Sequence, residues 1–248
     1  MHIFITGGTG GIGKALTDLY LNAGHHVGVC GGSRDAFEQL FPDCPARLQF
    51  FDLDVTDRAA TRAHISEFCG GKLDLLIAAA GINDGAPVAG RSLDFERAEK
   101  IFQVNLVGVL HSIEAALENM LPHQQGRIAV LSSAAALSGF PQTPAYCASK
   151  TALVTLCESL ALRYHDQGVS VTCLLPGYID TPLARATHPN LDKMPFLVSS
   201  ENAALTIQKA IEKQKLRVIF PWQVRWIGLL LQLMPRSLFK MLCKWSEK

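Results

Sequence analysis

The stretch "TGGTGGIG", residues 6–13, decides the fold because of what stands on either side of it. The apolar run "HIFIT" before it is typical of a buried strand, and the amphipathic "GIGKALTDLYLNAG" is typical of a helix that ends near Gly24. Between the two, Gly7 permits a tight turn, Gly11 lets the backbone approach a pyrophosphate, and Gly13 lets the helix pack on the sheet. The anion would lie on the N–H groups of the first helical turn. A glycine-rich turn that binds no ligand is the alternative.

The alternation of apolar runs and amphipathic stretches continues along the chain. We predict further strands at 25–30, 48–55, 73–81, 127–133 and 169–177, and helices at 58–69, 94–120, 145–166 and 200–213. Strand followed by helix predicts an α/β fold in which a parallel sheet carries helices on both faces. No repeat or low-complexity linker is present, so residues 1–248 are predicted to form a single domain. Residues 182–200 contain three prolines and little periodicity, which predicts a long substrate loop.

Composition argues against several classes of protein. The formal net charge is +1 and 18% of residues are charged, so neither a nucleic-acid-binding stripe nor an acidic tail is expected. The seven cysteines show no CxxC pair or zinc-like spacing, and the histidines show no pairing at metal spacing. We therefore expect reduced thiols, a cytoplasmic location and no metal. The start "MHIFITGG" runs directly into a strand, so no secretory leader is expected.

The C-terminal segment, 221–248, is unusually hydrophobic. Residues 221–245, "PWQVRWIGLLLQLMPRSLFKMLCKW", carry all three tryptophans, and Pro235 should divide them into two helical pieces. The run "WIGLLLQLMP" is too short to span a bilayer. Two interpretations stay open. The segment could line the substrate pocket or contact another subunit, or it could lie on a membrane surface as a peripheral helix.

The end of the second predicted strand indicates which dinucleotide is preferred. An NAD enzyme usually has an acidic residue there, which binds the ribose 2′-hydroxyl. This chain reads "VGVCGGSRD", so Ser33 and Arg34 come before the first acid, Asp35. Guanidinium binds phosphate in a planar, bidentate way, which favours the 2′-phosphate of NADP over NAD. Alternatively, Ser33 and Arg34 are solvated loop residues, and NAD is the cofactor.

A tyrosine and a lysine in "YCASK" indicate proton transfer. Tyr146 and Lys150 stand four positions apart in a predicted helix, so they share one face. A phenol with a pKa of about 10 is a poor base near neutrality, and a nearby positive charge favours the phenolate. Ser133, at the end of a predicted strand, would donate to the same substrate oxygen, with Ser132 as its rival. An ordinary surface pair is the alternative for the tyrosine and lysine.

Together these segments resemble the short-chain dehydrogenase/reductase family, in its single-domain branch. The resemblance rests on "TGGTGGIG", on Asn105 in "VNLVG", on Ser133 in "VLSS", on "YCASK", and on "PGYIDT" at 176–181. It implies a Rossmann-type doubly wound sheet and hydride transfer between a nicotinamide and an alcohol or carbonyl carbon. Family habit also implies a homodimer or homotetramer. The runs "AAALSGFP" and "MPFLV" suggest that the small-molecule substrate is apolar.

The resemblance assigns roles by position. Tyr146 is implied as general acid/base, Lys150 as the cation that lowers its pKa, Ser133 as the donor to the substrate oxygen, and Asn105 as the residue that orders a water relay. Asp54 and Val55 are implied at adenine, and Ile179 and Thr181 at the carboxamide. The full set of expected cofactor contacts is Gly7, Thr9, Gly10, Gly11, Ile12, Gly13, Ser33, Arg34, Asp54, Val55, Ala79, Ala80, Gly81, Tyr146, Lys150, Pro176, Gly177, Ile179 and Thr181.

The chain departs from the family pattern in two places. Ala78, Ala79, Ala80 and Gly81 stand where the family commonly has Asn-Asn-Ala-Gly, which removes side-chain amides that tie the central strands together. Gly10 stands where NADP users often have a basic residue. Two other functions remain as alternatives. A dinucleotide-sensing binding protein would not need Tyr146 and Lys150, and a nucleotide-sugar epimerase would need a larger second domain after Thr181.

Overall fold

A parallel seven-stranded sheet forms the centre of the molecule, in a computed structural model that describes residues 1–85, 93–188, 190–235 and 237–241. The strand order is β3-β2-β1-β4-β5-β6-β9, and every neighbouring pair is parallel. The bounds are β1 His2–Thr6, β2 His26–Cys30, β3 Leu48–Phe51, β4 Leu75–Ala78, β5 Gly126–Leu131, β6 Val169–Pro176 and β9 Arg217–Phe220. This order confirms the predicted doubly wound α/β sheet. It reverses between β1 and β4, the position where such sheets bind ligands.

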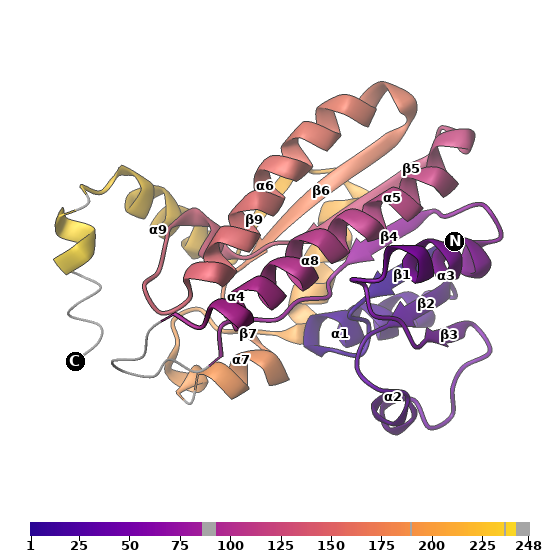
Figure 1. The fold of residues 1–248 in the computed structure, drawn as a ribbon, viewed down its shortest axis with the longest axis horizontal. Helices are drawn as coiled ribbons and strands as arrows, with labels where there is room; N and C mark the ends of the chain where they lie inside the picture. Colours follow the sequence, from indigo (N-terminus) through magenta and orange to yellow (C-terminus); the bar gives the residue numbers. More distant parts are fainter. Residues whose placement is uncertain (86–92, 189, 236, 242–248) are drawn as a thin grey trace.

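Helices cover both faces of this sheet (Figure 1). One face carries α3 (Arg58–Cys69), α5 (Gly108–Met120) and α6 (Pro144–Tyr164), and the other carries α1 (Gly11–Asn22), α2 (Arg34–Leu40) and α8 (Ser200–Glu212). The helix predicted at 94–120 is formed by α4 (Phe95–Phe102), a π-helical turn η1 (Gln103–Val107) and α5. A π turn inserted in a helix is frequent at functional sites.

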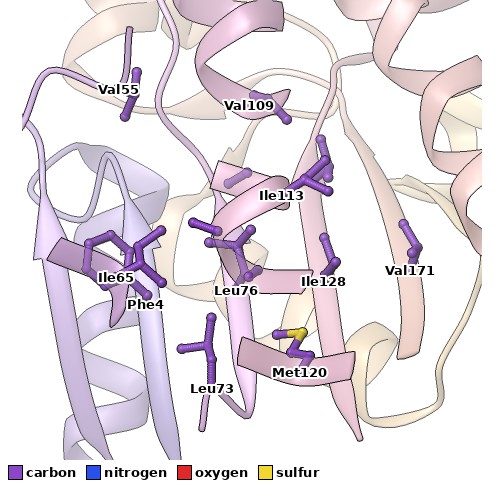
Figure 2. Close-up of a cluster of buried hydrophobic side chains, with 14 of the residues drawn as sticks. Phe4, Val55, Ile65, Leu73, Leu76, Val109, Ile113, Met120, Ile128 and Val171 are labelled. Atoms are coloured by element: carbon purple, nitrogen blue, oxygen red, sulfur yellow. The ribbon is translucent and has the colours of Figure 1, made fainter. Parts of the chain in front are cut away.

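The two faces have separate hydrophobic cores because the central strands are apolar on both sides. Figure 2 shows part of the first core, where Leu76 and Ile128 of the sheet lie beneath Ile113 of α5. In the second core, Leu16 of α1 and Ile207 of α8 pack on the opposite side of the strands. Burying side chains of this size contributes about 1.5–3 kcal/mol each. The cores therefore hold rigid the strand ends from which the candidate site is built.

Near the sheet edges, one predicted strand is shorter than expected and two elements were not predicted. The strand predicted at 48–55 ends at Phe51, because the following Asp54 folds into a turn in which its carboxylate accepts from the N–H and hydroxyl of Thr56. The helix α2 was not predicted; it begins after Ser33, whose hydroxyl caps it by accepting from the N–H of Ala36. The strand β9 was missed; it is short and becomes a strand by pairing with β6.

The predicted long loop at 182–200 is more ordered than expected. It contains α7 (Pro182–Thr187) and β8 (Val198–Ser199), which pairs with β7 (Ile179–Asp180). The Thr181 hydroxyl caps α7 by accepting from the N–H of Ala184, and Pro182 stands where a helix tolerates proline. Local capping therefore explains why part of this segment is helical.

The C-terminal segment forms a helix, as predicted, and breaks at the predicted position. The helix α9 (Trp222–Leu233) ends before Pro235, and residues 237–241 are helical again. The rest of the predicted segment, 242–248, lies outside the described residues. Of the helices in the described ranges, none combines the length and the apolarity needed to cross a membrane.

Candidate active site

The glycine-rich loop forms a cradle that fits a pyrophosphate. Gly7 has a φ of 71°, and a Cβ there would lie 2.8 Å from the backbone nitrogen of Ala80. A Cβ on Gly13 would lie 2.0 Å from the carbonyl oxygen of Gly7, so the start of α1 packs directly on the loop. Among the described residues no side chain caps α1, and its first turn contains no acidic residue. The free N–H groups and the positive end of the helix therefore suit an anion.

The other loop positions lie against two further segments. The Thr9 hydroxyl donates to the carbonyl oxygen of Gly31 at 2.6 Å, which ties the glycine loop to the end of β2. A Cβ on Gly11 would lie 2.5 Å from Cγ2 of Thr181, so the segment after β6 borders the same loop. Gly10 is the N-cap of α1, and the half-buried Ile12 packs on the second core. All of the expected loop residues thus lie around one cradle.

Tyr146, Lys150 and Ser133 converge at the end of β5. Tyr146 and Lys150 come from the first two turns of α6, and the Lys150 ammonium lies 5.7 Å from the centre of the Tyr146 ring. The ammonium is buried and donates to the carbonyl oxygen of Leu131 at 2.8 Å. The Ser133 hydroxyl accepts from the N–H of Ala135 at 3.1 Å, so its own hydrogen is free to point at the Tyr146 phenol. The structure thus brings together three of the four predicted catalytic side chains.

Burial is the largest influence on the pKa values of Tyr146 and Lys150. Burial raises the pKa of the Tyr146 phenol, and the hydrogen bond from the Ser133 side chain acts in the opposite direction. Burial lowers the pKa of Lys150 to about 8. The resemblance implied that the ammonium lowers the pKa of the phenol. In the protein alone, burial is the largest influence on the pKa of the phenol, and it raises that pKa.

The contacts of Ser132 exclude it as the serine that donates to the substrate oxygen. Ser132 is buried, and its hydroxyl donates to the carbonyl oxygen of Lys150 at 2.7 Å. This bond ties β5 to α6 and leaves the hydroxyl directed into the protein. Ser133 is therefore the serine that faces the candidate site.

Asn105, the fourth predicted residue, lies in the π-helical turn and is fully buried. Its Nδ2 donates to the carbonyl oxygen of Ile82 at 2.9 Å and to Oγ of Ser149 at 3.1 Å, and its Oδ1 accepts from the N–H of Ile82 at 2.8 Å. Both amide hydrogens are used, and one lone pair of Oδ1 remains. A Cβ on Gly81 would lie 3.2 Å from this oxygen and 3.4 Å from the Lys150 nitrogen, so Asn105 and Lys150 border the same backbone.

The alanines that replace the family's asparagines leave the central strands joined. The Thr6 hydroxyl, at the end of β1, accepts from the N–H groups of Ala79 at 3.2 Å and Ala80 at 3.3 Å. This threonine connects the ends of β1 and β4 directly. The strand ends are therefore joined through a hydroxyl of the neighbouring strand.

The two residues predicted to select the dinucleotide lie at the start of α2. Ser33 and Arg34 are exposed, and the Arg34 guanidinium lies 5.4 Å from the centre of the Phe50 ring. A Cβ on Gly32, whose φ is 68°, would lie 3.1 Å from Oγ1 of Thr9, so this turn passes close to the glycine loop. The Ser33 hydroxyl is already used as the cap of α2. The hydroxyl accepts in that cap, so its own hydrogen can still donate, and both Ser33 and Arg34 are available to an anion.

The remaining predicted contacts differ in how accessible they are. Asp54 is exposed, whereas Val55 is buried against Gly108. Pro176 ends β6 and is buried, and Ile179 is 4% exposed in the second core. Gly177 packs against the start of α9, where a Cβ would lie 2.8 Å from Cγ2 of Val224.

Two residues of this site were not predicted from the sequence. The carboxylate of Asp84 accepts from the backbone N–H of Tyr146 at 3.0 Å, across 62 residues of sequence. The Ser149 hydroxyl donates to the carbonyl oxygen of Tyr146 at 2.8 Å and accepts from Asn105. Both hold the first turn of α6 in place. Neither has a sequence signal, since polar residues in a loop or on a helix are common.

In the described ranges, no group of three or more His, Cys, Asp or Glu side chains lies close enough together to hold a metal ion.

A model of a known protein family, described as short chain dehydrogenase, matches residues 1–192. The chain belongs to the short-chain dehydrogenase/reductase family. An uncharacterized oxidoreductase of Myxococcus xanthus is 31% identical over 240 residues, which are 95% of this chain and 93% of that protein. A 3-oxoacyl-(acyl-carrier-protein) reductase of Rickettsia conorii is 30% identical over 180 residues, 72% of this chain and 73% of its own length.

Solved structures of this short-chain dehydrogenase/reductase fold are also similar. A short chain dehydrogenase from Burkholderia cenocepacia in complex with NADP superimposes with a TM-score of 0.82 at 24% identity, covering 97% of this chain and 96% of that one. ElxO with NADP bound superimposes with a TM-score of 0.77 at 24% identity, covering 88% of this chain and 95% of that one. These likenesses confirm the fold.

Proposed function

We propose that this short-chain dehydrogenase/reductase is an NADP-preferring oxidoreductase that transfers hydride between the nicotinamide and an alcohol or carbonyl carbon. The observation that carries the proposal is the convergence of Tyr146, Lys150 and Ser133 at the end of β5. The glycine cradle, at the switch point of the same sheet, fits the dinucleotide. The NADP complexes of two similar structures support the choice of cofactor.

The side chains divide the chemistry of carbonyl reduction among them. When bound, the nicotinamide supplies the hydride. Charge then develops on the substrate oxygen, and the Ser133 and Tyr146 hydroxyls donate to that oxygen. Because burial raises the pKa of Tyr146, the phenol stays protonated near neutrality and can give its proton to the oxygen. The reverse reaction needs the phenolate.

Lys150 and Asn105 act by position and charge. The Lys150 ammonium has three hydrogens, of which one is used by Leu131, so two can bind ribose hydroxyls. Its positive charge favours the phenolate of Tyr146 whenever the proton leaves. Asn105 holds the backbone of Ile82 in place, and its remaining Oδ1 lone pair can accept from a water of the proton relay.

Turnover with a panel of aldehydes, ketones and alcohols, each with NADPH, NADP, NADH and NAD, tests the proposed function. We expect NADPH oxidation with apolar carbonyl compounds, since Leu137 lies in the segment after Ser133 and packs on the apolar helix α9. A protein that binds the dinucleotide tightly and turns over none of these compounds would be a sensor, and the enzyme assignment would be withdrawn.

Arg34 is proposed to bind the 2′-phosphate of NADP. In Arg34→Ala, we expect KM for NADPH to rise by at least about tenfold and KM for NADH to change little, because a charge-assisted contact contributes about 1.5–3 kcal/mol. Steady-state kinetics with both cofactors measures the ratio. Arg47→Ala serves as the control, since this arginine is exposed and lies beside Gly24, at the other end of α1. Equal changes for NADPH and NADH would contradict the contact.

Oligomeric state and location remain predictions. We propose a homodimer or homotetramer in the cytoplasm. The six cysteines in the described part of the chain are free, and five of these thiols are buried, which supports a reducing compartment.

A further inference from the structure

The helix α9 carries an apolar face that the rest of the described chain leaves uncovered. Trp222, Trp226, Leu230 and Leu233 are 68%, 64%, 62% and 83% exposed, and Leu229 is 38% exposed. Their spacing of i, i+4, i+7, i+8 and i+11 places them on one side of a helix. We call these five residues the outer face of α9. A continuous apolar surface of this kind marks an interaction site.

The opposite side of α9 is fixed against the candidate active site. A Cβ on Gly228 would lie 2.3 Å from Cδ1 of Leu137, in the segment after Ser133. Val224 packs against Gly177, in the segment after β6. These contacts prevent the helix from turning its tryptophans inward. In Figure 1, α9 lies at the end of the molecule away from β1, β2 and β3.

The charge of the segment indicates what covers this face. From residue 221 to residue 248 the sequence contains five Lys or Arg and one acidic residue, Glu247, although the whole chain has a net charge of only +1. Arg225 and Lys240 are exposed. If two copies met through the same face, the excess of cations in one segment would meet the same excess in the other, which is unfavourable. An anionic lipid surface complements the charge, and tryptophan and leucine suit its boundary between headgroups and acyl chains.

We propose that the outer face of α9 docks on the surface of a bilayer that contains anionic lipid. The tryptophan and leucine side chains enter the interface, and Arg225 and Lys240 bind lipid headgroups. Because the inner side of α9 contacts the segments after Ser133 and after β6, docking holds the candidate active site next to the lipid. This inference concerns binding and stands whether or not the proposed reaction is correct.

The intrinsic fluorescence of the protein reports on this segment alone, because all three tryptophans, Trp222, Trp226 and Trp245, lie in it. We expect the emission of the full chain to shift to the blue with vesicles of phosphatidylcholine and phosphatidylglycerol, and to be quenched when the lipids are brominated. Phosphatidylcholine alone should bind more weakly. The double variant Leu230→Gln/Leu233→Gln should lower the partition coefficient by at least about tenfold, because it removes two inserting side chains.

Leu162→Gln is the matched control, since Leu162 is 82% exposed on α6 and outside the outer face. It should partition as the wild type does, and all variants should melt at the same temperature because the replaced side chains are exposed. The proposal is overturned if vesicles leave the emission unchanged, or if the double variant binds like the control. A third outcome also overturns the proposal: the emission shifts to the blue without vesicles, at the protein concentrations where light scattering shows a doubled mass. That result would identify a second copy of the chain as the partner.

Discussion

Tyr146→Phe is expected to lower kcat by about 10²–10⁴-fold, which is the usual contribution of a positioned acid or base. The change removes one oxygen and leaves the ring in its half-buried place on α6. Cofactor binding should persist, because the glycine cradle and Lys150 are untouched. The measurement is turnover of the best carbonyl substrate with NADPH, together with the dissociation constant of NADPH.

Tyr164→Phe is the matched control, because Tyr164 is the last residue of α6 and lies about five turns from Tyr146. It should keep wild-type turnover. If Tyr146→Phe also keeps full activity, the phenol is not the proton donor. The proposed roles of Ser133 and Lys150 then fail as well, because they depend on that donor. A variant that is inactive because it fails to bind NADPH would point instead to a structural role for the hydroxyl.

Gly13→Ala is expected to destabilise the protein and to weaken dinucleotide binding. A Cβ at this position would lie 2.0 Å from the carbonyl oxygen of Gly7. Gly7 cannot move away easily, since it packs closely on the backbone of Ala80. Overpacking of this kind costs about 1–3 kcal/mol, which corresponds to a drop in Tm of about 2–12 °C in a chain of this size. Because the start of α1 must shift, the affinity for NADPH should fall by at least about tenfold.

Gly10→Ala makes the same chemical change three residues earlier. Gly10 has a φ of −84°, which any residue adopts, and a Cβ there would come no closer than 3.4 Å to another atom. Differential scanning calorimetry and fluorescence titration with NADPH should therefore show a much smaller effect than in Gly13→Ala. If the two variants behave alike, the close packing of α1 on the loop is not what the glycines provide.

The residues proposed to carry the chemistry could be named from the sequence, but several of their contacts could not. Tyr146 and Lys150 were placed on one helix face by a spacing of four, which is a local property, and the resemblance gave the pair its proposed role. Asn105 was found by resemblance, and its clamp on Ile82 became visible only in the structure. Asp84 was missed altogether, because no local pattern connects it with the N–H of Tyr146.

Two expectations failed or changed for reasons that lie outside the local sequence. The alanines after β4 suggested a loosened centre, yet the hydroxyl of Thr6 on the neighbouring strand joins the ends of β1 and β4. The pKa of the phenol was expected to be lowered, but burial raises it, and burial depends on how the whole molecule excludes water.

The sequence by itself determined the alternation of strands and helices and the position of the glycine-rich loop, and it named the side chains proposed to react. These depend on the periodicity of apolar residues and on the absence of Cβ atoms, which act within a few residues. Only the tertiary structure decided the clamp on Asn105, the anchoring of Tyr146 by Asp84, and which side of α9 remains exposed. Each of these depends on contacts between segments far apart in the chain, and the packing of the sheet and its helices brings those segments together.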